Sequence, residues 1–149
     1  MQASMELRRT PAAPALLLVG AAAACWLLLC TCSYSITTAH INSAQLARGY
    51  NQGKAVNPTT TFSPSDRVIH LVVIVGNAPE DTKVGATWYA VDAGGSQNEK
   101  LDSASGTLKN GEDHVDLTLS NTANWPRGKY RVDLMLDDKR DRTIDFRVK

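Results

Sequence analysis

The stretch "NTANWPRGKYRVDLML", residues 121–136, places two large aromatic residues beside a strand-like alternation of polar and apolar residues. Pro126 fixes φ and Gly128 supplies a backbone conformation that other residues avoid, so together they suit a tight turn into a strand. Tyr130, at the start of that strand, is placed to bury its ring and return its hydroxyl to nearby backbone, as a tyrosine corner does. Trp125 is expected to cap the end of the core. We therefore interpret the cluster as a structural corner, in preference to an exposed aromatic binding site.

Two upstream segments extend this pattern. The stretch "KVGATWYAVD", residues 83–92, puts Trp88 and every second residue around it on one face. The stretch "RVIHLVVIVGN", residues 67–77, is apolar on both faces and rich in β-branched residues. It therefore indicates a strand at the centre of the fold. Trp88 is therefore expected to point inward, into the core.

Short candidate strands recur along the chain after residue 39, and turn signals separate them. They are residues 40–50, 67–77, 83–92, 100–109, 114–120, 128–136 and 142–149. Between the first two, residues 51–66 are rich in Pro, Thr, Asn and Gly, which indicates a loop or an edge crossover. No window after the N-terminal segment has a helical period. We predict an all-β, immunoglobulin-like (fibronectin III-like) sandwich of about seven strands, preceded by one N-terminal hydrophobic helix.

The N-terminal segment differs from the rest of the chain in its amino-acid composition. Residues 14–36, "PALLLVGAAAACWLLLCTCSYSI", carry no charge, and Arg8 and Arg9 precede them. A helix over residues 15–36 would extend roughly 33 Å, enough for a bilayer core of about 30 Å. The positive-inside rule keeps the arginines cytoplasmic and exports the C-terminal part. We therefore predict a cytoplasmic tail (1–14), a signal anchor (15–36), a first strand with a crossover (37–66) and a sandwich body (67–149).

Two other fates of the N-terminal segment remain open. Thr37 and Ala39 stand at the small-residue positions of a signal-peptidase site, and cleavage there would leave His40 as the new N-terminus of a secreted protein. Lipidation of a cysteine after cleavage is the third fate, although neither Cys30 nor Cys32 follows the usual small residue. Cys25 follows Ala24, but an apolar run succeeds it. The length of the apolar stretch favours the uncleaved anchor.

The bulk composition excludes several classes of protein. All three cysteines lie in the apolar segment, so the folded portion has neither a disulfide nor a thiolate metal site. The net charge is +1 and the charges of both signs are interleaved. Nucleic-acid binding needs a concentrated basic surface, so we expect no nucleic-acid partner.

Several stretches together resemble a widespread group of bacterial exported domains. They are "INSAQLARGYNQGKAVNPTTTFSPSDRVI", "NAPEDTKVGATWYAVD", "WPRGKYRVDLML" and "DRTIDFRVK", and the resemblance runs from about residue 39 to residue 149. Members resemble immunoglobulin-like modules behind a signal sequence, a lipoprotein signal or a membrane span. The group brings no known catalytic residue or ligand, so the resemblance bears on the fold and the location alone.

Catalytic and metal motifs are missing from the sequence. Neither G-x-S-x-G nor H-E-x-x-H occurs, so we expect no enzyme activity and no cofactor. His70 is expected to be a hydrogen-bonded core residue and His114 a solvated one. One alternative involves copper: a freed amino group at His40, its ring nitrogen and a second histidine, His114 or His70, would form a histidine brace.

The acidic residues near the C-terminus do not match a calcium loop. Asp137, Asp138, Asp141 and Asp145 are interrupted by basic residues, which suits a charged hairpin that blocks strand addition at an exposed edge. The sequence favours a non-enzymatic, membrane-tethered module that binds another envelope protein or a glycan. An accessory subunit of an envelope complex is a further alternative.

Overall fold

The computed structural model describes residues 38–149, and every regular element in this range is a strand. The nine strands of this part are β1 (His40–Asn51), β2 (Lys54–Pro58), β3 (Thr61–Phe62), β4 (Val68–Gly76), β5 (Lys83–Ala93), β6 (Ser96–Thr107), β7 (His114–Ser120), β8 (Gly128–Leu136) and β9 (Lys139–Val148). Within the same residues, no helix is long and apolar enough to span a membrane. The predicted tail, the predicted anchor and all three cysteines lie outside the described residues.

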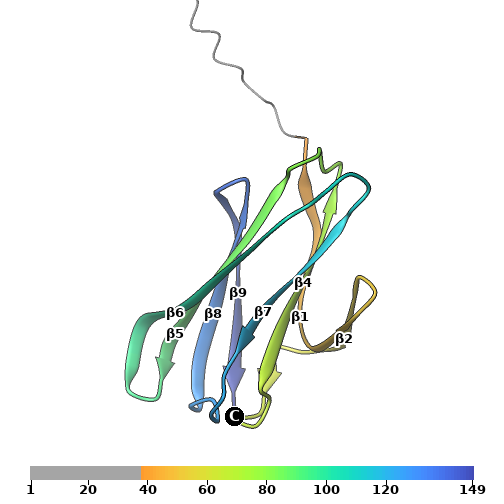
Figure 1. Ribbon diagram of the computed structural model, residues 1–149. Helices are drawn as coiled ribbons and strands as arrows, with labels where there is room; N and C mark the ends of the chain where they lie inside the picture. Colours follow the sequence, from red (N-terminus) through yellow and green to blue (C-terminus); the bar gives the residue numbers. More distant parts are fainter. Residues whose placement is uncertain (1–37) are drawn as a thin grey trace, which may run out of the picture. The chain divides into compact units, whose positions relative to one another are not determined.

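The strands form two sheets (Figure 1). One has the order β2-β1-β4-β7 and the other the order β3-β9-β8-β5-β6. Neighbouring strands are antiparallel, except that β3 runs parallel to β9. The prediction of an all-β architecture with two sheets is confirmed.

The core lies between the two sheets and follows the period of two that the sequence shows. Ile69, Leu71 and Val73 alternate along β4 with no exposed surface. Trp88 on β5 and Val132 on β8 are equally buried, and they are register partners in the five-stranded sheet. Alternate apolar residues of both sheets therefore meet in one layer, where burial of apolar surface stabilises the fold.

Residues 51–66 hold two strands that the sequence does not predict. Their composition indicates a loop or crossover, yet β2 pairs with β1 and β3 pairs with β9. Both strands are short and lie at sheet edges, where Pro58 need not remove a ladder hydrogen bond. The chain passes from one sheet to the other between them. The described part therefore has nine strands instead of the expected seven or so.

The β1–β2 hairpin bends over the outer face of the four-stranded sheet, and Figure 1 shows it curling beside β1 and β4. Its Tyr50 ring lies 6.3 Å from the ring of His114 on β7, measured between centroids. A Cβ atom at Gly53 would stand 3.2 Å from the same ring, so the turn packs directly on His114. On the neighbouring strand β4, Val72 faces outward and is nevertheless only 3% exposed. The outward face of a strand in this sheet is thus partly buried.

Candidate functional site

The aromatic cluster around Trp125 and Tyr130 lies at one end of the core. Tyr130 is 2% exposed, and its hydroxyl donates a hydrogen bond to the carbonyl of Pro126 at 2.6 Å. Burial raises the pKa of the Tyr130 phenol above its ordinary value of 10.0. The ring stacks on Phe146 with a centroid separation of 5.3 Å. Both the ring and the hydroxyl group of Tyr130 therefore make their contacts inside the protein.

Trp125 joins two loops at the same end. Its indole N–H donates to the carbonyl of Asp66, and its backbone N–H donates to the carbonyl of Pro64. These bonds tie the β7–β8 connection to the β3–β4 connection. Trp125 is 6% exposed and meets Tyr130 edge-on, with centroids 6.4 Å apart. The corner offers no large exposed aromatic surface to a ligand.

Gly128 sits where two backbones approach closely. Its φ is +151°, and a Cβ atom there would lie 2.2 Å from the carbonyl oxygen of Asp92. No side chain fits this gap, so glycine allows β8 to begin against β5.

Trp88, on the inner face of β5, meets Phe146 edge-on at 6.0 Å, and its indole N–H has no hydrogen-bond partner among residues 38–149.

The histidines do not share a site in the described structure. His40 begins β1 and its Nδ1 donates a hydrogen bond to the Thr38 carbonyl, and His114 begins β7, with β4 between the two strands. His114 hydrogen-bonds to Asp113 at 2.8 Å, which lowers the pKa of the Asp113 carboxyl. Within residues 38–149, no three residues of the metal-binding types gather as a ligand set.

His70 is placed differently from the expectation. It lies on the outer face of β4, with 20% of its side chain exposed, and its Nδ1 is 2.8 Å from a carboxylate oxygen of Asp116 on β7. The valines and isoleucines around it in the sequence suggest a core position. Side chains alternate between the two faces of a strand. Because Ile69 and Leu71 point into the core, His70 between them points outward.

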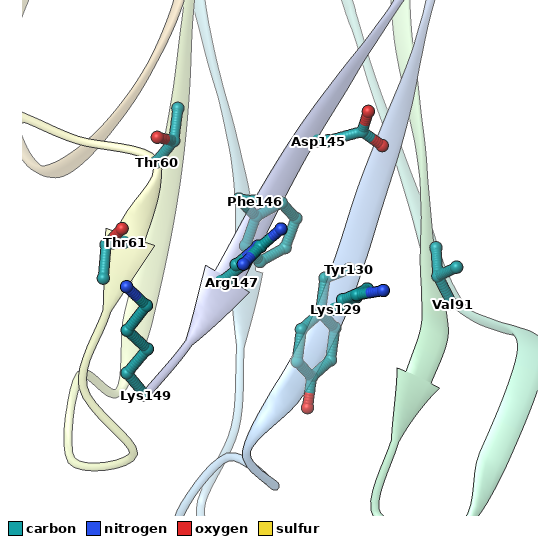
Figure 2. Close-up of a pocket in the computed structure, with 9 residues that line it drawn as sticks. All are labelled: Thr60, Thr61, Val91, Lys129, Tyr130, Asp145, Phe146, Arg147 and Lys149. Atoms are coloured by element: carbon teal, nitrogen blue, oxygen red, sulfur yellow. The ribbon is translucent and has the colours of Figure 1, made fainter.

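A groove lies on the outer face of the five-stranded sheet. Its volume is about 460 Å³, and β3, β9, β8 and β5 contribute to its lining. Figure 2 shows Lys129, Arg147 and Lys149 reaching out from adjacent chain segments, with Asp145 further along β9. Tyr130 and Phe146 also border the groove, but their rings point into the core on the other side of the sheet. We call this feature the basic groove.

Two cations of the basic groove stand directly opposite each other. Lys129 on β8 and Arg147 on β9 are register partners, and like charges at such positions repel. In the described part of the chain, neither side chain forms an ion pair. Arg131, the next outward cation on β8, lies over the Tyr89 ring at 4.4 Å and hydrogen-bonds to Asn98. The lining of the groove therefore carries more basic side chains (Lys129, Arg147 and Lys149) than acidic ones (Asp145).

Sequence reasoning does not find this groove. Thr60, Val91, Lys129 and Arg147 come from four separate segments, and the alternation predicts only that outward residues face solvent. The run "KRDRTIDFRVK" marks β9 as charged but does not indicate which strand lies beside it. Only the β8–β9 register shows that Lys129 and Arg147 stand opposite each other.

The fold is similar to that of a solved immunoglobulin-like protein from Pseudomonas aeruginosa. The match covers 74% of this chain and 96% of that one, with a TM-score of 0.53 and 13% sequence identity. The described part has an immunoglobulin-like fold. Trp88 on β5 and the Tyr130 hydroxyl bond at the start of β8 fit that fold, which places a core tryptophan and a tyrosine corner on the corresponding strands.

A second solved structure shares less of the architecture. It is an alkylpurine DNA glycosylase from Pseudomonas fluorescens bound to DNA containing an abasic site analogue; the match covers 74% of this chain and 30% of that one, with 14% identity and a TM-score of 0.46. A likeness at this level does not bear on the function of the immunoglobulin-like chain. No protein-family model and no curated protein matches the sequence.

Proposed function

We propose that this protein is a non-enzymatic binding module of the bacterial cell envelope, tethered to the membrane by its N-terminal apolar segment and exposed outside the cytoplasm. The immunoglobulin-like fold supports an interaction module, since the two-sheet core holds its outer faces rigidly. The uncharged residues 14–36, with Arg8 and Arg9 before them, support the tether. The missing catalytic motifs support a non-enzymatic role.

The observation that carries the proposal is the basic groove. Lys129 and Arg147 stand on paired strands and not on loops, so the sheet holds their backbone positions before any ligand arrives. A site that needs less rearrangement of the backbone has a smaller entropy cost on binding. A partner protein or glycan of the envelope is therefore expected to meet the outer face of the five-stranded sheet.

Site-specific photo-crosslinking in native membranes tests the proposal. A photoreactive residue replaces Thr87, which faces outward on β5, and in a matched control it replaces Thr118, which is exposed on β7 of the other sheet. We expect one dominant crosslinked product from position 87 and none from position 118. Equal products from both positions, or none from position 87, would contradict binding at this face.

A further inference from the structure

Lys129 and Arg147 of the basic groove stand directly opposite each other on two paired strands. Some basic residues of the described part are paired with an acidic side chain, whereas others, such as Lys54 and Lys109, are not. Arg48, Lys83 and Arg142 lie 2.6–3.4 Å from the carboxylate oxygens of acidic neighbours. Lys129 and Arg147 have no such neighbour within 4.0 Å, although they are opposed across two paired strands. Repulsion between them costs stability in the free protein. An anion seated between them would remove that repulsion, and the Arg147 fork can hold a carboxylate with two parallel hydrogen bonds.

Asp145 restricts which anion fits. It is two residues before Arg147 on β9, so both side chains face the same side of the sheet and line the same groove (Figure 2). Its register partner Arg131 is turned toward Tyr89 and Asn98. A carboxylate beside the cations repels a simple inorganic anion, but it accepts hydrogen bonds from hydroxyl groups.

The remaining lining residues suit a ligand rich in hydroxyls. Thr60 and Thr61 bring hydroxyl groups to the β3 side of the groove, and Val91 brings an apolar contact on the β5 side. The volume of about 460 Å³ is in the range of small-molecule sites and is large enough for a sugar unit. A carboxylate group, several hydroxyls and an apolar ring face occur together in an acidic saccharide.

We propose that the basic groove binds an acidic saccharide, a pyranose unit that carries a carboxylate. Lys129 and Arg147 bind the carboxylate of the sugar, and Asp145 accepts its ring hydroxyls. The inference rests on the proposed function as a binding module and names its ligand class. Because the cations are exposed, affinity is modest, roughly millimolar for one unit, and it falls as salt is added.

Binding to the full chain tests the inference, with trigalacturonate as the acidic probe and a neutral galactose trimer as its control. At low ionic strength we expect the acidic trimer to bind roughly tenfold more tightly than the neutral one. The double variant Lys129→Gln/Arg147→Gln should lose most of that difference. The matched variant Lys54→Gln/Lys109→Gln makes the same charge change at exposed positions away from the groove and should retain it. Equal losses in both variants would overturn the site.

The variant Asp145→Ala separates a saccharide site from a simple anion site. Removing the carboxylate takes away an acceptor for sugar hydroxyls and also takes away repulsion toward phosphate. We expect the ratio of trigalacturonate to phosphate affinity to fall several-fold. An unchanged or higher ratio would overturn the saccharide assignment and leave an adventitious anion only. If trigalacturonate fails to bind while the crosslink at position 87 persists, the inference is wrong and the proposed function stands.

Discussion

The hydroxyl of Tyr130 illustrates how single polar atoms define the corner of this domain. Its hydrogen bond to Pro126 reaches four residues back along the chain and holds the β7–β8 connection against the core. Trp125 does the same across the chain through the Asp66 and Pro64 carbonyls. A buried polar group stabilises a fold only while its partner is present. These aromatic side chains are therefore better described as supports for two loops than as a ligand surface.

The change Tyr130→Phe should lower the free energy of unfolding by about 1–2 kcal/mol at pH 7, because it leaves the Pro126 carbonyl without its donor. Chemical denaturation measures this difference. The folded-state pKa of Tyr130 is raised, so its contribution is present below pH 10.0 and is lost as the pH rises through the folded-state pKa. The difference in free energy of unfolding between the unmodified protein and the Tyr130→Phe variant should therefore become smaller above pH 10.0. A constant gap would contradict the burial of an un-ionised phenol.

The change Gly128→Ala should destabilise the protein by at least about 2 kcal/mol, since the new Cβ atom would meet the Asp92 carbonyl and the backbone has positive φ. Gly95→Ala is the matched control. Its φ is +85°, but the space around it is open, so only the conformational cost of about 1 kcal/mol applies. Thermal unfolding of both variants checks this, and equal losses would argue against the close approach of β8 and β5.

Individual strands differ in how far the rest of the fold covers them. β4 pairs on both sides and is buried on its inner face, while its outer face is partly covered by the β1–β2 hairpin. β6 lies at the edge of its sheet, and most of its residues are exposed. A bulge opposite Trp88 and Tyr89 interrupts its pairing with β5, and the charges of Glu99 and Lys100 lie beside it. Such features make an edge strand less able to add a further strand.

Hydrogen exchange should rank the strands in the same order. Peptides from β4 are expected to exchange slowest, because their amides are paired on both sides over a buried face, and peptides from β6 fastest. Mass spectrometry after deuterium labelling of the full chain measures this. Equal protection of β4 and β6 would mean that the edge of the five-stranded sheet is covered in solution.

The strands themselves could largely be predicted from local pattern. Alternation around Trp88 and Val132, with turns at Gly94 and Asp137, marks β5 and β8 without any tertiary information. The short strand β3 could not, since it pairs with β9 at the far end of the sequence. The strand β2 forms a tight hairpin with β1, but its composition indicates a loop. The apolar neighbours of His70 likewise suggested a core position, whereas the structure places it on an outer face.

At the scale of the whole molecule, the sandwich is built without covalent crosslinks, since residues 38–149 contain no cysteine. Its stability comes from one apolar layer between two sheets, whose aromatic members are Phe62, Trp88, Trp125, Tyr130 and Phe146. The outer faces of the two sheets are not part of this layer, and they differ from each other. One carries the β1–β2 hairpin and the other carries the basic groove.

The intact protein recovered from native membranes should retain Met1 or its immediate neighbours, because the apolar stretch is longer than a typical signal-peptide core. Intact mass and N-terminal sequencing measure this. A chain that starts at His40 would instead indicate secretion and would make copper binding the next test. An acylated cysteine would indicate a lipoprotein that carries the same sandwich.

The sequence by itself determined the all-β class and most of the strand positions, because these depend on period-two patterning and on the backbone preferences of Pro and Gly over a few residues. Only the tertiary structure decided that β1 and β3 belong to different sheets and that Lys129 stands opposite Arg147. Strand order and register depend on contacts between distant segments, and many pairings satisfy the same local pattern. The groove exists only once that register is chosen.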